Sequence, residues 1–323
     1  MDINSIFQDT HQDFAGLAQQ IFVYQYAHNP VYQQWCQLNH FGLDQPFSPL
    51  TCPALPLGFF KTHRVYCGES EPEMVFESSR TTGMVPSQHF VKDLSVYEKS
   101  FLEGFKAVYG QPSNWCILAL LPAYLERSQS SLVYMAQTLI HQSKHPQSGF
   151  YLNNFADLDH TIGLLEAAAQ PTLLLGVTFA LLDFSAAYPR PLKHTRVMET
   201  GGMKGRGREL IRQELHDLLC ARWGLASIEG EYGMTEMMSQ AYALSGGLYQ
   251  PPPWLKAYVV AEDDPLQVQE SGTGLLRFID LANVHSCSFL QTQDLGRVYP
   301  DGRFEVFGRM DHADVRGCSL LFV

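Results

Sequence analysis

The stretch that decides the fold reads Gly230-Glu231-Tyr232-Gly233-Met234-Thr235-Glu236. The apolar segment 225–228 precedes it and a Met-rich run begins at Met237, so the stretch is predicted to form a turn between a strand and a helix. Tyr232 can stack on a base, and Thr235 can hydrogen-bond a phosphate oxygen. Glu236 can hold Mg²⁺, which prefers oxygen ligands and shares them with substrate phosphates. The alternative is a plain turn, with Glu236 facing the positive end of the helix dipole.

Composition and charge describe an ordinary globular protein. Of the 323 residues 46% are hydrophobic and 17% charged, and the net charge is −11. The acidic balance argues against nucleic acid as a partner, which needs clustered Lys and Arg, but it does not exclude ATP. The N-terminus shows no secretory signal, and the longest apolar run, 172–184, is too short to cross a bilayer. We therefore expect a cytoplasmic protein with no membrane span.

The seven cysteines form no C-x-x-C pair, and neither they nor the twelve histidines show zinc spacing. In a reducing compartment we expect seven free thiols, most of them buried as small hydrophobic residues. Cys318 stands apart from the others because it lies five residues from the C-terminal end of this sequence.

Short apolar stretches alternate with helical patterns between residues 97 and 200. Helices are predicted over 97–109, 131–140 and 162–168, and strands over 115–121, 172–177 and 195–198. This alternation predicts α/β layers around a mostly parallel sheet. Ligands bind such sheets at loops beyond the carboxyl ends of the strands. The loop from Ser78, the Gly201-Gly202 turn and the Tyr232 turn all follow predicted strands, so we expect them to share one site.

A loop rich in hydroxyl groups follows a predicted strand near residue 76. It reads Glu77-Ser78-Ser79-Arg80-Thr81-Thr82-Gly83. Hydroxyls and backbone N–H groups in such a loop can face an anion together, as in phosphate-binding loops. The loop is not a G-x-x-x-x-G-K-[ST] motif, and a plain polar turn is the alternative.

The composition shifts at Pro251-Pro252-Pro253, which predicts two parts: an α/β lobe with a helical N-terminal segment over 1–250, and a β-rich part over 251–323. In the second part, strands are predicted at 255–261, at 274–280 and around Phe289. A hairpin is predicted across Pro300-Asp301-Gly302, because Asp-Gly is a strong hairpin signal.

Taken together and in order, these motifs resemble those of the adenylate-forming superfamily of acyl-CoA synthetases and related ligases. The resemblance implies ATP with Mg²⁺, and a fold with a layered α/β lobe and a β-rich subdomain. It assigns ATP contacts to a set of loop residues, with Asp294 and Arg309 on the ribose hydroxyls and Glu236 on the metal. The set comprises Ser78, Ser79, Thr81, Thr82, Gly83, Gly201, Gly202, Tyr232, Gly233, Thr235, Asp294 and Arg309.

A closer resemblance is to the acyl-protein synthetases of the bacterial bioluminescence fatty-acid reductase complex. It is carried by the stretches 130–135, Met198-Glu199-Thr200-Gly201-Gly202-Met203-Lys204-Gly205 and Arg316-Gly317-Cys318. The resemblance implies activation of a fatty or other carboxylic acid as acyl-AMP, followed by transfer to a cysteine thiol. The match places the acylated cysteine at Cys318, and a reductase or carrier protein is the implied acyl acceptor.

Two features depart from the superfamily pattern. Arg80 stands where the loop usually has Gly, which either reshapes the loop or adds a phosphate contact. The mobile C-terminal domain of the superfamily, which supplies a catalytic lysine, is expected to be absent; Lys204 and Arg206 are the candidate replacement cations, and Lys204 is predicted to be catalytic.

Two other functions remain open at this stage. One is an acyl-CoA ligase of the phenylacetate-CoA ligase type, which would use coenzyme A as the thiol. The other is a non-catalytic nucleotide-binding or scaffold subunit, which the Arg80 departure permits.

Overall fold

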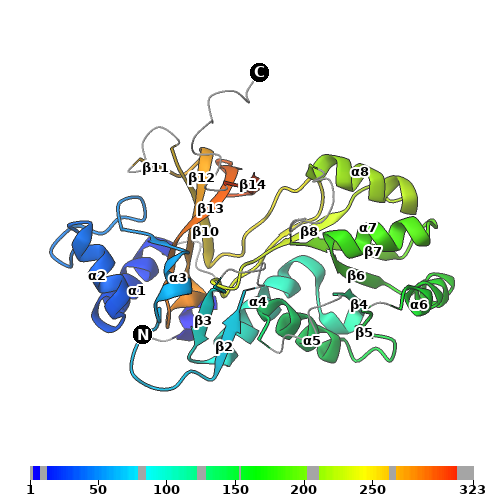
Figure 1. The fold of residues 1–323 in the computed structure, drawn as a ribbon, viewed down its shortest axis with the longest axis horizontal. Coiled ribbons are helices and arrows are strands. Elements are labelled where there is room, and N and C mark those ends of the chain that lie inside the picture. Colours follow the sequence, from blue (N-terminus) through cyan, green and yellow to red (C-terminus); the bar gives the residue numbers. More distant parts are fainter. Residues whose placement is uncertain are drawn as a thin grey trace. The chain divides into compact units, whose positions relative to one another are not determined.

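The computed structural model describes residues 3–7, 13–78, 85–121, 129–152, 154–201, 211–261 and 267–310. The chain forms two compact units (Figure 1). One joins Met1–Ser70 to Pro253–Val323, and the other comprises Glu71–Pro252.

The unit Glu71–Pro252 is built on a mostly parallel sheet of order β5-β4-β6-β7-β8-β9, in which only β9 runs antiparallel to its neighbour. Residues in β4 and β6 are buried throughout, as expected for strands covered on both faces. Its strands are β2 (Met74–Glu77), β3 (Gln88–Val91), β4 (Cys116–Leu120), β5 (Gly149–Phe150), β6 (Thr172–Val177), β7 (Thr195–Thr200), β8 (Glu229–Tyr232) and β9 (Ala241–Ala243); β2 and β3 form a separate hairpin.

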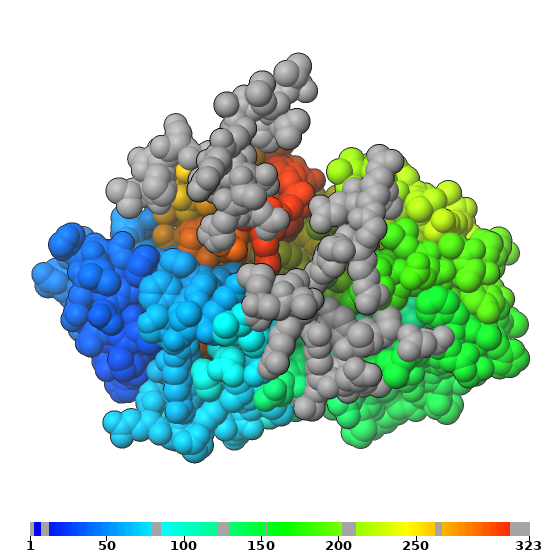
Figure 2. All heavy atoms as spheres, viewed as in Figure 1, coloured from blue at the N-terminus to red at the C-terminus, as the bar shows by residue number. Residues whose placement is uncertain are grey.

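The helices of this unit have local start and stop signals. Asp93 accepts a hydrogen bond from Ser95 N at the start of α4, and Gly224, with φ of 66°, ends α8. Figure 1 shows α6, α7 and α8 grouped together and α4 beside α5, and the green atoms of 130–187 form the outer surface of the unit in Figure 2. The helices are α4 (Leu94–Tyr109), η2 (Pro112–Asn114), α5 (Ser131–Ser143), α6 (Phe155–Ala167), α7 (Thr178–Ala187) and α8 (Arg212–Trp223).

The other unit contains a sheet of order β1-β13-β12-β10-β11, with β14 also paired to β13. The predicted Asp-Gly hairpin is confirmed: Val298 pairs with Phe304, and Gly302 has φ of 85°. Its elements are η1 (Ile3–Phe7), α1 (Phe14–His28), α2 (Pro30–Leu38), β1 (Leu55–Pro56), α3 (Phe59–Thr62), β10 (Leu255–Val260), β11 (Val268–Gln269), β12 (Gly272–Asp280), η3 (Leu281–Asn283), β13 (Phe289–Val298) and β14 (Phe304–Arg309).

The N-terminal segment belongs with this C-terminal sheet, which corrects the predicted grouping of residues 1–250. Gln25 of α1 is fully buried, and its Nε2 donates to Asn283 O at 2.9 Å and to Val284 O at 3.0 Å. Tyr32 stacks on Phe289 with ring centroids 5.6 Å apart. A buried amide must find partners, and here its partners lie about 260 residues further along the chain. The predicted boundary near 250 agrees with the break between Pro252 and Pro253.

Most predicted elements between 97 and 200 are confirmed. Within the described ranges, no helix is both long enough and apolar enough to cross a lipid bilayer.

Candidate functional site

The carboxyl ends of three neighbouring strands meet at one edge of the parallel sheet. In register, Val177 of β6 lies beside Thr200 of β7, and Thr200 lies beside Glu231 of β8. Gly201 follows β7 directly and Tyr232 is the last residue of β8. The fold therefore places the Gly201 turn and the Tyr232 stretch side by side, as predicted from their positions after strands.

The stretch after Tyr232 is an irregular connection between β8 and β9, and the helix predicted there is wrong. Met237 N donates to Met234 O at 3.1 Å, and β9 then returns antiparallel to β8. Met237 and Met238 are buried in this connection. A short apolar run has no periodicity that would distinguish these conformations in the sequence. A Cβ on Gly233 would meet Glu231 Oε1 at 2.6 Å, so any larger residue here would require the Glu231 side chain to shift.

Two contacts hold the turn in place. His89 of β3 lies with Nδ1 2.7 Å from the Thr235 carbonyl oxygen, and the Ser100 and Ser239 hydroxyls are 3.1 Å apart. Glu236 is 7% exposed, and the Tyr232 ring lies 5.6 Å from the Tyr249 ring. These tertiary contacts have no local sequence signal.

The predicted phosphate loop begins at the end of β2. Ser78, at the start of the loop, is hydrogen-bonded to Ser87, which follows it. Ser87 N donates to Ser78 Oγ at 2.9 Å, and Ser78 N donates to Ser87 O at 3.0 Å. The remaining loop residues of the prediction lie outside the described residues, as does Arg80. They are Ser79, Thr81, Thr82 and Gly83.

The first residue after β7, Gly201, has a backbone conformation that favours glycine. Gly201 has φ of 78°, in the left-handed region where a Cβ is strained. Gly202, Lys204 and Arg206 lie beyond the described residues, so their predicted roles stay predictions.

Asp294 and Arg309 form an ion pair in the other unit, on facing positions of β13 and β14. Arg309 Nε donates to Asp294 Oδ1 at 3.1 Å. The Asp294 side chain is 9% exposed and that of Arg309 is 58% exposed. The carboxylate is therefore buried, whereas the arginine side chain is largely exposed to solvent. The two residues therefore lie side by side, and their predicted contacts with ribose remain a prediction.

Two buried carboxyl groups at the strand ends were not predicted as site residues. Glu199 is 4% exposed and its carboxyl group lies within hydrogen-bonding distance of the Thr178 hydroxyl; Glu231 is 6% exposed and accepts a hydrogen bond from Thr200. Burial raises the pKa of Glu231 to about 7, against the lowering effect of the Thr200 bond, and the nearby Glu199 charge adds to the rise. Burial likewise raises the pKa of Glu199. In the sequence, Glu199 follows the apolar pair Val197-Met198, whereas Glu231 lies in the polar strand Glu229–Tyr232 and has no comparable signal.

The raised pKa of Glu231 predicts how the free energy of unfolding changes with pH. An unfolded Glu releases its proton near pH 4.3, whereas folded Glu231 holds it to about pH 7, so the wild-type free energy of unfolding falls across this range. We expect Glu231→Gln to be more stable than wild type by about 3–4 kcal/mol near pH 8, with little of this gain near pH 4. Urea unfolding at both pH values measures this, with exposed Glu214→Gln as control. An equal effect at both pH values contradicts it.

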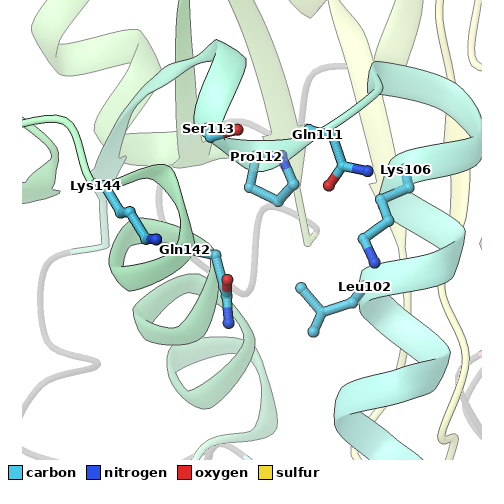
Figure 3. A pocket seen from close by; sticks show the side chains of 7 residues that line it. All are labelled: Leu102, Lys106, Gln111, Pro112, Ser113, Gln142 and Lys144. Atoms are coloured by element: carbon cyan, nitrogen blue, oxygen red, sulfur yellow. The ribbon is translucent and has the colours of Figure 1, made fainter.

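A surface cavity of about 230 Å³ lies away from this edge (Figure 3). Lys106 and Leu102 reach it from α4 and Gln142 from α5, and Pro112 of η2 covers it on the side that leads into β4. Lys106 Nζ is already paired with Glu103 at 2.8 Å. None of the predicted site residues lines the cavity.

The described residues contain no cluster of three or more His, Cys, Asp or Glu that would bind a metal ion through the protein alone. Glu236 is the described carboxylate that the sequence assigns to Mg²⁺. A single protein oxygen suits a cation that takes its other ligands from substrate phosphates and water. The donor chemistry of Glu236 therefore fits the predicted metal.

No family model and no curated protein matches the sequence. Solved structures do match: ATP-bound MatB from Rhodopseudomonas palustris has 17% identity over 75% of this chain and 49% of its own, with a TM-score of 0.53. O-succinylbenzoate coenzyme A synthetase (MenE) from Bacillus subtilis, with ATP and magnesium ion, has 18% identity over 73% of this chain and 49% of its own, with a TM-score of 0.51.

A MenE double mutant bound to its product analogue OSB-NCoA has 18% identity over 74% of this chain and 50% of its own, with a TM-score of 0.52. The chain thus spans about half the length of these structures. At these identities the likeness concerns the fold. It confirms the predicted fold class, a layered α/β lobe with a β-rich subdomain.

Proposed function

We propose that this protein uses ATP to activate a fatty or other carboxylic acid as acyl-AMP and then transfers the acyl group to a cysteine thiol. The observation that carries the proposal is the sheet edge where Gly201 and the Tyr232–Glu236 turn lie next to each other. The overall fold is similar to that of MatB bound to ATP and of MenE bound to ATP and magnesium ion. Ligands of open α/β sheets bind at this edge.

In the first step, a carboxylate oxygen of the acid attacks the α-phosphorus of ATP and the bond to pyrophosphate breaks. The products are acyl-AMP and pyrophosphate. Several negative charges approach one another in this step, so catalysis depends on positioning and on groups that stabilise the phosphoryl oxygens. Hydroxyls of the loop that starts at Ser78, the Thr235 hydroxyl and a cation at Lys204 are assigned these roles.

Glu236 is assigned to hold Mg²⁺ when ATP is bound. The ion supplies charge neutralisation for the phosphates. The Thr235 carbonyl is tied to His89 at 2.7 Å, so the backbone that carries Glu236 is fixed before any ligand arrives. Asp294, held by Arg309, is assigned to the two ribose hydroxyls, which a carboxylate accepts well.

In the second step, a thiolate attacks the acyl carbonyl carbon, and the bond to the AMP oxygen breaks. A thioester and AMP result, and the thiol proton leaves before the attack. The described cysteines are poor candidates for the thiol: five are buried and Cys220 is partly buried. Burial raises the pKa of Cys36 to about 12 and those of Cys52 and Cys116 to about 11. This supports the assignment of the acyl group to Cys318, which lies outside the described residues.

A second candidate is an acyl-CoA ligase, in which coenzyme A supplies the thiol. The similarity in fold to MenE bound to its product analogue OSB-NCoA supports this second candidate. Pyrophosphate exchange with a panel of acids tests the first step. Release of AMP with and without coenzyme A then separates the two acceptors. No exchange with any acid would leave a nucleotide-binding subunit as the better description.

We expect Glu236→Gln to weaken the Mg²⁺-dependent part of ATP binding, because an amide oxygen is a poorer ligand than a carboxylate. Adenosine, which has no phosphate, should bind this variant as it binds the wild type. Calorimetry with ATP, with and without Mg²⁺, measures the difference, and the exposed Glu214→Gln serves as the control. Equal metal dependence in Glu236→Gln and wild type would remove Glu236 from the metal site.

We expect Asp294→Ala to weaken adenosine as well as ATP by about 10-fold or more, since a hydrogen bond to a charged group contributes about 1.5–3 kcal/mol. The exposed Asp301→Ala in the neighbouring turn is the matched control. If Asp294→Ala binds adenosine like Asp301→Ala, the carboxylate serves only its ion pair with Arg309.

A further inference from the structure

The Thr178 hydroxyl joins the ends of β6 and β7. Its Oγ1 lies within hydrogen-bonding distance of Glu199 Oε1 and 3.1 Å from the Gly201 carbonyl oxygen. Thr178 is 1% exposed and Glu199 4%, so water does not substitute for either contact. Neither residue has a role in the chemistry described above.

The two contacts of Thr178 restrict where the protons lie. A hydroxyl has one proton to donate, and a carbonyl oxygen only accepts. If Glu199 is ionised, Thr178 must donate to it, and the Gly201 carbonyl is left without a donor from Thr178. If Glu199 is protonated, its O–H donates to Thr178 Oγ1, and Thr178 is free to donate to Gly201. Each contact has its own proton only in the protonated state; in the ionised state a single hydroxyl proton would have to serve both oxygens.

The surroundings of Glu199 favour the protonated state. Burial is the largest effect on the pKa of Glu199 and raises it, while the Thr178 hydrogen bond and the positive charge of Arg212 on α8 lower it, and the net direction is upward. Glu231 on β8 faces the same region, and the Glu199 charge raises its pKa. Tyr249 is also close; burial first, and then both carboxyl charges, raise its pKa.

We infer that Glu199 is a positioning residue of the nucleotide site: protonated, it donates to Thr178, which then donates to the Gly201 carbonyl and holds the turn after β7. That this turn serves a nucleotide rests on the proposed function. Gly201 has φ of 78°, so the chain direction changes at this residue, and a fixed carbonyl sets where the rest of the turn begins.

A glycine-specific NMR experiment tests the proton arrangement without any ligand. The sequence has two Gly-Gly pairs, Gly201-Gly202 and Gly246-Gly247. Protein labelled with ¹³C-carbonyl glycine and ¹⁵N glycine therefore gives two HNCO signals, one from the Gly201 carbonyl and one from Gly246 as an internal control. Glu199→Gln cannot ionise, and its amide can still donate to Thr178. Thr178→Val has no hydroxyl.

We expect the wild-type Gly201 signal to match Glu199→Gln, and to differ from Thr178→Val, at about pH 6. Buried carboxyl groups can have pKa values up to about 9. Near pH 9 the wild-type signal therefore either still matches that of Glu199→Gln, if Glu199 is protonated, or moves towards that of Thr178→Val, if Glu199 is ionised. A wild-type signal that matches Thr178→Val at every pH overturns the inference. So does a Glu199→Gln signal that matches Thr178→Val. The folded state of each variant is checked by the Gly246 signal.

AMP binding then tests the positioning role. We expect Thr178→Val to bind AMP about 3–10-fold more weakly than wild type, which corresponds to one lost hydrogen bond, and Thr178→Ser to restore the affinity. Glu199→Gln should keep the low-pH affinity of the wild type throughout. Wild-type affinity in Thr178→Val overturns the positioning role. If the wild type binds no AMP, the proposed function fails, while the Gly201 signals still report the proton arrangement.

Discussion

Cys318→Ser is expected to abolish acylation of the protein while acyl-AMP still forms. Incubation with ATP, Mg²⁺ and a labelled fatty acid should place hydroxylamine-sensitive label on the C-terminal peptide of the wild type. The serine variant should show none, because a serine hydroxyl near neutral pH has almost no anionic form to attack the acyl carbonyl. The loss should be complete, since no other residue replaces a covalent acceptor.

The burial of the described thiols sharpens this test. Cys220 is the most accessible of the described cysteines, so Cys220→Ser is the matched control and should be labelled like the wild type. Peptide mapping of both variants distinguishes the thioester site from non-specific labelling. Label that persists in Cys318→Ser, or that appears only on added coenzyme A, removes Cys318 from the reaction.

Lys204→Ala is expected to slow acyl-AMP formation by about 10²–10³-fold, the usual effect of removing one group that stabilises transition-state charge. ATP binding should weaken much less, because the charge on the phosphoryl oxygens grows only as the carboxylate attacks. Lys204 follows Gly201 by three positions in the chain, and Gly201 stands at the carboxyl end of β7. Single-turnover formation of acyl-AMP measures the rate directly.

The exposed Lys193, which precedes β7, supplies a control of the same charge. Lys193→Ala should leave the single-turnover rate unchanged, so any effect of overall net charge is subtracted. If Lys204→Ala also forms acyl-AMP at the wild-type rate, Lys204 is a solvated loop residue and another cation serves the reaction.

Local patterns in the sequence were sufficient to predict elements in both units. The apolar run Thr172–Val177 predicts a buried strand, and the structure confirms β6 over those residues. Asp301-Gly302 predicts the hairpin of β13 and β14, and Gly302 has the positive φ that this turn requires. These predictions succeed because each depends on interactions between residues that are close in the chain.

The prediction of a helix after Glu236 was wrong because too few residues were available to show a periodicity. Met237 and Met238 are apolar at any spacing, and so few residues do not distinguish a helix from a strand. The hydrogen bond from Met237 N to Met234 O and the pairing of β9 with β8 decide the matter, and the second of these is a tertiary interaction. The candidate site was predicted as a set of loops, but the shape of its central turn was not.

By itself, the sequence determined the alternation of strands and helices and the order of the motifs, and it predicted the sheet edge at which Gly201 and Tyr232 lie. The tertiary structure decided where the polar residues inside apolar segments find their partners. Gln25 donates hydrogen bonds to backbone carbonyls of Asn283 and Val284. The Thr178 hydroxyl contacts both the Glu199 carboxyl group and the Gly201 carbonyl. The physical reason is that a buried polar group is stable only when it is hydrogen-bonded, and its partner can lie anywhere along the chain. Periodicity shows that a segment is buried, whereas the folded packing alone shows what its polar atoms contact.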